Sequence, residues 1–120
     1  MSPDTRACVA YAALRLISSR DASAIFDCSR SIYISIAGTV SNTALHLYDF
    51  SRNSPFGGKC NNGEYQLYDF EQSSKVDLRI NGQHYEGFDH GSQTRFSGTV
   101  QGDATSLYDY ATDGYFDYVF

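Results

Sequence analysis

A short phrase recurs along this chain of 120 residues with a fixed step of 20 residues. Each copy contains an apolar residue, an aromatic residue, an aspartate and a second ring, and the third copy departs from the pattern. The copies are Leu47-Tyr48-Asp49-Phe50, Leu67-Tyr68-Asp69-Phe70, Gly87-Phe88-Asp89-His90 and Leu107-Tyr108-Asp109-Tyr110. A fixed period of this length is the signature of one supersecondary unit that is used repeatedly.

Each repeat is predicted to form a β-hairpin. Residues that tolerate positive φ, as tight hairpin turns require, occupy one place in every unit: Asn42, Asn62, Gly82 and Gly102. In the third unit we place the turn at Asn81-Gly82, which sets Asp77 opposite Glu86. Because side chains alternate across a strand, the predicted core face of this unit carries Val76, Leu78, Ile80 and Tyr85, and the outer face carries Asp77, Arg79, His84 and Glu86.

A parallel solenoid with one coil per repeat is the alternative fold for this period. It would stack the repeated aspartates about 4.8 Å apart, and such a ladder of like charges is unfavourable without a cation. Hairpins separate the same aspartates by two strands, about 9.6 Å. The repeated acids therefore favour hairpins over a solenoid.

The amino-terminal segment is predicted to be a helix over about residues 3–19. Ser2 can cap it, Pro3 suits the first helical position, and Asp4 suits the positive end of the helix dipole. Apolar residues surround much of its circumference, and the predicted solvent-facing side carries Arg6, Arg15 and Arg20.

The predicted fold is α+β within a single domain over residues 1–120. Residues 1–30 form the helix and a connector, and residues 31–120 form the hairpin repeats. The helix packs on a curled antiparallel β-meander of four hairpins, and a last strand over residues 115–120 closes an open or barrel-like sheet.

Charge and cysteine content exclude several classes of function. The formal net charge of −5 disfavours nucleic acid and anionic membrane surfaces, because both bind through Lys and Arg. Asp4 lies where an export signal would be basic, and Arg15 interrupts the apolar run far short of a membrane span. Cys8, Cys28 and Cys60 have no metal-binding spacing, which indicates reduced thiols. We therefore expect a cytoplasmic protein that needs no cofactor.

The rings of the phrase are expected to point away from the leucines, and three interpretations are open. They fill a second core, form a homo-oligomer interface, or bind a carbohydrate or a small planar molecule with aspartates as hydrogen-bond acceptors. The aspartates can also fix the turns that follow them. The predicted binding residues are Tyr48, Phe50, Tyr68, Phe70, Phe88, Tyr108, Tyr110, Asp49, Asp69 and Asp109.

One polar cluster could indicate a small enzyme: His84, Glu86, Asp89 and His90, all near one hairpin. A straight strand would separate the two histidines by about 20 Å, too far for a shared metal. We therefore expect a non-catalytic module that associates with itself or binds a ligand, with catalysis at this cluster as the less favoured alternative.

Overall fold

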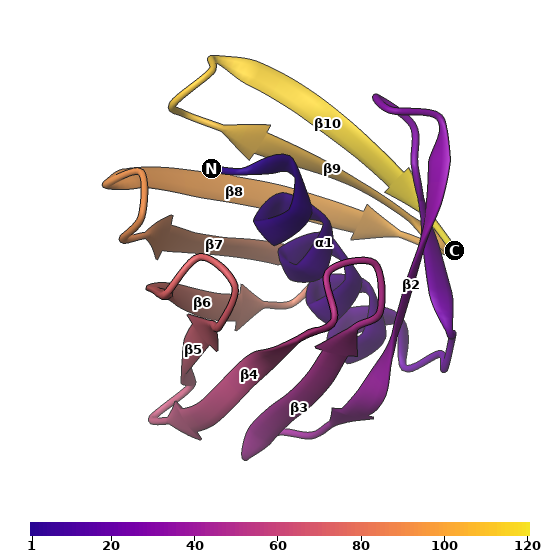
Figure 1. The fold of residues 1–120 in the computed structure, drawn as a ribbon. Coiled ribbons are helices and arrows are strands. Elements are labelled where there is room, and N and C mark those ends of the chain that lie inside the picture. The colour runs from indigo at the N-terminus through magenta and orange to yellow at the C-terminus, as the bar shows by residue number, and fades with distance from the viewer.

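The computed structural model describes residues 1–120 as a closed barrel of ten antiparallel strands around one helix (Figure 1). The predicted α+β fold is confirmed, and the sheet closes. Consecutive strands are neighbours throughout, and β1 pairs with β10. The elements are α1 (Pro3–Ser18), β1 (Ala24–Asp27), β2 (Ile32–Val40), β3 (Ala44–Asp49), β4 (Ser54–Asn61), β5 (Glu64–Asp69), β6 (Ser74–Asn81), β7 (His84–Asp89), β8 (Thr94–Gln101), β9 (Ala104–Asp109) and β10 (Gly114–Val119).

Helix α1 begins and ends where its capping residues dictate. The Ser2 hydroxyl accepts a hydrogen bond from the Thr5 amide at 3.1 Å, and Pro3 occupies the start of the helix. At the other end, Ser19 adopts a left-handed conformation with φ of 58°, which stops the helix.

The helix lies inside the barrel, in the middle of the ring of strands (Figure 1). Every residue from Ala7 to Leu14 is fully buried, because this stretch is apolar or small around its whole circumference and such a helix must be covered on all sides. The predicted solvent-facing side is therefore wrong at its amino-terminal end, where Arg6 is only 5% exposed.

The width of the barrel explains why a helix fits in it. Following the paired residues once around the barrel shifts the register by about 14 residues. Ten strands with this stagger form a cylinder with a backbone radius of about 10 Å. A helix with its side chains is about 10–12 Å in diameter, so the helix and the inward-facing side chains of the sheet together fill the interior.

Glycine and leucine face each other across each hairpin, and this pairing explains the irregular third copy of the phrase. Gly58 pairs with Leu67 and Gly98 with Leu107, whereas the third hairpin has Leu78 opposite Gly87. The large and small residues have exchanged strands. A Cβ atom at Gly87 would overlap the Phe96 ring and the Asp77 carbonyl oxygen, so packing alone accounts for the missing leucine.

The register of the third hairpin differs from the prediction by one step. Gly82 begins the turn with φ of 63°, and Asn81 pairs with His84. Glu86 therefore lies opposite Arg79 rather than Asp77, which replaces a repulsive pair with an attractive one. The two faces are unchanged, because the shift moves every partner by two residues.

Strand β1 lies in the segment that was expected to be a connector. It pairs with β2 over four residues and with β10 over two. Its sequence Ile25-Phe26-Asp27 is a further copy of the phrase, placed 22 residues before Leu47. The irregular step concealed it from a search at the fixed period.

Candidate functional site

The repeated aspartates all lie at one end of the barrel, which we call the aspartate end. Asp27, Asp49, Asp69, Asp89 and Asp109 are each at most 4% exposed. Each side chain accepts a hydrogen bond from a backbone amide two residues further on, at distances of 3.0–3.2 Å. The acids therefore stabilise the turns that follow their strands, which is the role that a residue needed at every turn would have.

Buried guanidinium groups neutralise most of these carboxylates. Arg52 bridges Asp49 at 2.6 Å and Asp69 at 3.0 Å, and only 6% of its side chain is exposed. Burial opposes the charged form of Arg52, but the hydrogen bond to Asp49 and nearby negative charge hold its pKa above the ordinary value. Arg6 pairs with Asp109 at 3.1 Å.

A second aspartate–arginine pair joins strand β1 to the helix. Arg30 contacts Asp27 at 2.7 Å and Asp4 at 2.9 Å. Burial alone would raise the pKa of Asp27, but hydrogen bonds from Arg30 and Ser29 outweigh it, so this pKa is lowered. The amino terminus of α1 lies at the same end, since the Thr5 hydroxyl donates to Asp69 at 2.6 Å.

The aspartates named as binding residues therefore face the interior, on the opposite side of the wall from the rings. No buried side-chain nitrogen or oxygen in the protein lacks a hydrogen-bond partner. A ligand on the outer surface would not reach Asp49, Asp69 or Asp109. These three residues hold the barrel together at its aspartate end.

Cys8 lies within the Arg52 cluster. Its Sγ atom is 3.6 Å from an Asp49 oxygen and 3.3 Å from Arg52 Nη2. Burial, reinforced by the Asp49 charge, raises the pKa of this thiol, so it is held neutral and is a poor nucleophile. Cys28 is exposed and Cys60 is partly exposed, and all three cysteines are free thiols.

The polar cluster suggested as an enzymatic site is not assembled. His84 contacts Thr99 at 3.1 Å, near the turn of its hairpin. His90 contacts Asp77 at 2.8 Å, beyond the other end of β7. Asp89 faces inward. No group of three or more His, Cys, Asp or Glu side chains is placed to hold a metal ion.

The rings of the phrase lie outside the barrel wall at the aspartate end. Within each copy the first ring packs edge-on against the second, with centroids 4.8–5.0 Å apart. Phe26 and Tyr33 make an equivalent pair at 4.8 Å, and Tyr115 packs on Tyr108 at 4.8 Å. We call this set the aromatic collar: Phe26, Tyr33, Tyr48, Phe50, Tyr68, Phe70, Phe88, His90, Tyr108, Tyr110 and Tyr115.

Exposed apolar side chains are confined to the aspartate end. The large hydrophobic residues with high exposure are Ile32, Tyr33, Phe50, Phe70, Tyr110 and Tyr115, and each lies where its strand meets an aspartate turn. The opposite end has short hairpin turns and an ion pair between Arg20 and Asp103. The surface is therefore strongly polarised along the barrel axis.

One sector of the collar is free of charged side chains. Between Tyr48 and Tyr68, the intervening strand β4 places Pro55 opposite Tyr48 and Gly57 opposite Tyr68. Further round the barrel, Lys75 and Asp77 separate Tyr68 from Phe88. We call the uninterrupted part the β3–β5 sector: Tyr48, Phe50, Pro55, Gly57, Tyr68 and Phe70.

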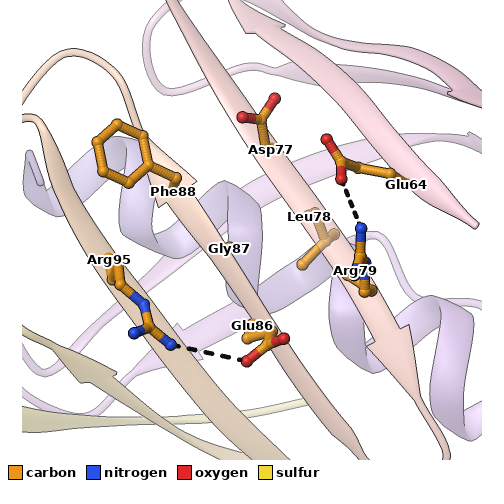
Figure 2. A pocket seen from close by; sticks show the side chains of 8 residues that line it. All are labelled: Glu64, Asp77, Leu78, Arg79, Glu86, Gly87, Phe88 and Arg95. Atoms are coloured by element: carbon orange, nitrogen blue, oxygen red, sulfur yellow. Dashed lines mark hydrogen bonds and ion pairs between the residues drawn. The ribbon is translucent and has the colours of Figure 1, made fainter.

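A hollow lies beside the collar on the outer face of β5 to β8 (Figure 2). Its charged walls are already paired, Glu64 with Arg79 at 2.8 Å and Glu86 with Arg95 at 3.9 Å. These exposed pairs are weak and can exchange partners. The lining residues are Glu64, Asp77, Leu78, Arg79, Glu86, Gly87, Phe88 and Arg95.

The comparisons with known proteins give no relative from which a role could be transferred. No family model matches this chain, and no curated protein or solved structure matches it. Its single helix is too short and too polar to cross a membrane. The geometry described above therefore carries the functional argument.

Proposed function

We propose that this barrel is a non-catalytic binding module, and that it binds a second copy of itself through the β3–β5 sector. The observation that carries the proposal is the confinement of exposed large apolar side chains to one end of the molecule. A contiguous exposed patch of this kind marks contact surfaces in soluble proteins, and aromatic residues are enriched in the buried centres of such interfaces.

The sector offers enough apolar area for a reversible dimer. Phe50 and Phe70 are 54% and 55% exposed, and a phenylalanine buries on the order of 200 Å², so the pair exposes about 200 Å² in each copy. Two copies would bury about 400 Å² from these rings, worth about 10 kcal/mol at 25 cal/mol per Å². Association itself costs roughly 4–15 kcal/mol, so we expect dimerisation at micromolar or higher concentration.

Symmetry favours a second copy as the partner. A twofold axis through the sector brings the same apolar patch against itself, and neither copy has to bury a charge, because Pro55 and Gly57 fill the space between the ring pairs. A carbohydrate or a planar ligand is the alternative occupant of the collar. It would have to bind without the inward-facing aspartates, whose carboxylates would otherwise supply the acceptors.

Analytical ultracentrifugation across a concentration series tests the proposal. The wild type should shift from monomer to dimer, and a Phe50→Ser, Phe70→Ser double variant should stay monomeric. His46→Ser with Lys59→Ser is the matched control, because both residues lie exposed on the same strands nearer the other end. Urea unfolding of all three proteins should show that the variants remain folded.

A wild type that stays monomeric at high concentration would contradict the proposed self-association. An unchanged dimer in the Phe50 and Phe70 variant would move the interface away from the β3–β5 sector. A glycan array provides the alternative arm. A hit that the double variant loses would assign the collar to carbohydrate instead.

A further inference from the structure

The barrel has an incomplete seam between β10 and β1. Strand β10 pairs with β9 over six residues, from Gly114 to Val119, but with β1 at Tyr118 and Val119 alone. One more hydrogen bond, from the Cys28 amide to the Asp117 carbonyl oxygen at 3.0 Å, ends the contact. The first half of β10 therefore has a strand on one side and none on the other.

The free edge is centred on Tyr115. In an antiparallel sheet, the backbone groups of successive residues point alternately to the two neighbouring strands. The Asp117 carbonyl points to the seam, because it accepts from Cys28. The amide and carbonyl of Tyr115, two residues earlier, point the same way. This residue therefore offers one donor and one acceptor to a further strand.

The side chains along this edge select the chemistry of a partner. Tyr115 is 72% exposed, and Tyr33, on the other side of the seam, is 75% exposed. Asp113 and Asp117 flank Tyr115 on the same outer face, because they lie two residues before and after it, and both are exposed. Arg30, in the loop that follows β1, is already paired with Asp4 and Asp27.

We propose that an extended basic segment of another protein adds to the edge of β10 as a further strand. Its apolar residue would lie on Tyr115, and a Lys or Arg two residues to either side would face Asp113 and Asp117. Main-chain hydrogen bonds to Tyr115 would hold the segment, and the alternating side chains would select it. This site is separate from the β3–β5 sector, so the proposal stands without the proposed function.

A second copy of β10 is a poor occupant of the same edge. Antiparallel pairing about Tyr115 would set Asp113 of each copy opposite Asp117 of the other. Like charges directly opposite each other on neighbouring strands are destabilising. Two such pairs would form in one short ribbon, whereas a basic segment would turn both contacts into attractions.

Fluorescence anisotropy with a labelled synthetic peptide, Gly-Lys-Thr-Val-Thr-Lys-Gly, tests the proposal. We expect saturable binding to the wild type, and binding at least about tenfold weaker for a peptide with Glu in place of both Lys. Tyr115→Thr and Tyr115→Pro form a matched pair, because both lose the ring and only proline loses the amide. Proline is tolerated where the amide of an edge strand faces solvent. The proline variant should bind about tenfold more weakly than the threonine variant.

Amide hydrogen exchange of the wild type provides a measurement that no variant can confound. The Tyr115 amide should exchange rapidly in the free protein and slowly with the peptide bound. The proposal is overturned by absence of binding at millimolar peptide, by equal binding to both Tyr115 variants, or by a Tyr115 amide whose exchange the peptide leaves unchanged. Protection that rises with protein concentration alone would assign the edge to a second copy instead.

Discussion

Replacing Arg52 with methionine should destabilise the protein strongly, because one guanidinium serves two buried acids. Asp49 and Asp69 are fully buried, and Arg52 contacts them at 2.6 and 3.0 Å. Removing one partner of a buried ion pair costs about 3–5 kcal/mol, because it leaves an uncompensated charge. The bound to use here is the upper half of that range, since two carboxylates lose their partner together.

The assay is urea unfolding followed by far-UV circular dichroism. Arg79→Met is the matched control, because Arg79 also pairs with a carboxylate, at 2.8 Å from Glu64, but 57% of its side chain is exposed. Such exposed pairs contribute about 0–1 kcal/mol. We expect Arg52→Met to lower the free energy of unfolding by about 4 kcal/mol and Arg79→Met by less than 1 kcal/mol.

A double variant separates lost charge compensation from lost packing. Asp69→Asn keeps an oxygen that can accept from the Glu71 and Gln72 amides, as the Asp69 carboxylate does at 3.1 and 3.0 Å. Added to Arg52→Met, it should restore part of the stability, because one buried charge disappears. The reasoning is refuted if Arg52→Met and Arg79→Met lose equal stability, or if Asp69→Asn makes the Arg52→Met variant less stable still.

Two further predictions concern the turns and the close-packed wall. Because the pKa of Asp27 is lowered in the folded protein, its ionised form stabilises the fold above the unfolded pKa of about 3.9, and this contribution is lost as the pH falls through the lower folded value. The stability difference between wild type and Asp27→Asn should therefore shrink as the pH falls below about 4, and a difference that grows in acid would contradict the assignment. Gly58→Ala should lower the free energy of unfolding by about 3 kcal/mol or more, because its Cβ atom would overlap the Gln66 carbonyl oxygen. Gly63→Ala is the control with open space at that atom but with φ of 79°, and thermal unfolding curves should show a smaller loss there.

The hairpins could be read from the sequence because their determinants are local. Alternation at period two assigned Leu47, Leu67 and Leu107 to the core face, and all three are buried. Turn residues such as Gly82 located every hairpin, although they left the third register open by one step. The turn-fixing role of the aspartates also followed from their repetition, since a strand end needs its own acceptor each time.

Several contacts at the aspartate end could not be predicted, because they join residues far apart in the chain. Nothing in the local pattern pairs Arg6 with Asp109 or Thr5 with Asp69. The burial of Arg6 follows only once the helix lies inside the barrel. Asp27 was recoverable in principle from the Ile25-Phe26-Asp27 triplet, but its step differs from the period.

The sequence by itself determined the hairpin units, their inner and outer faces, and the helix, because each depends on residues within a few positions of one another. The tertiary structure alone decided that the sheet closes, that α1 fills its interior and that the seam beside Tyr115 stays open. These features depend on the sum of small staggers over ten strands. No single hairpin contains that sum.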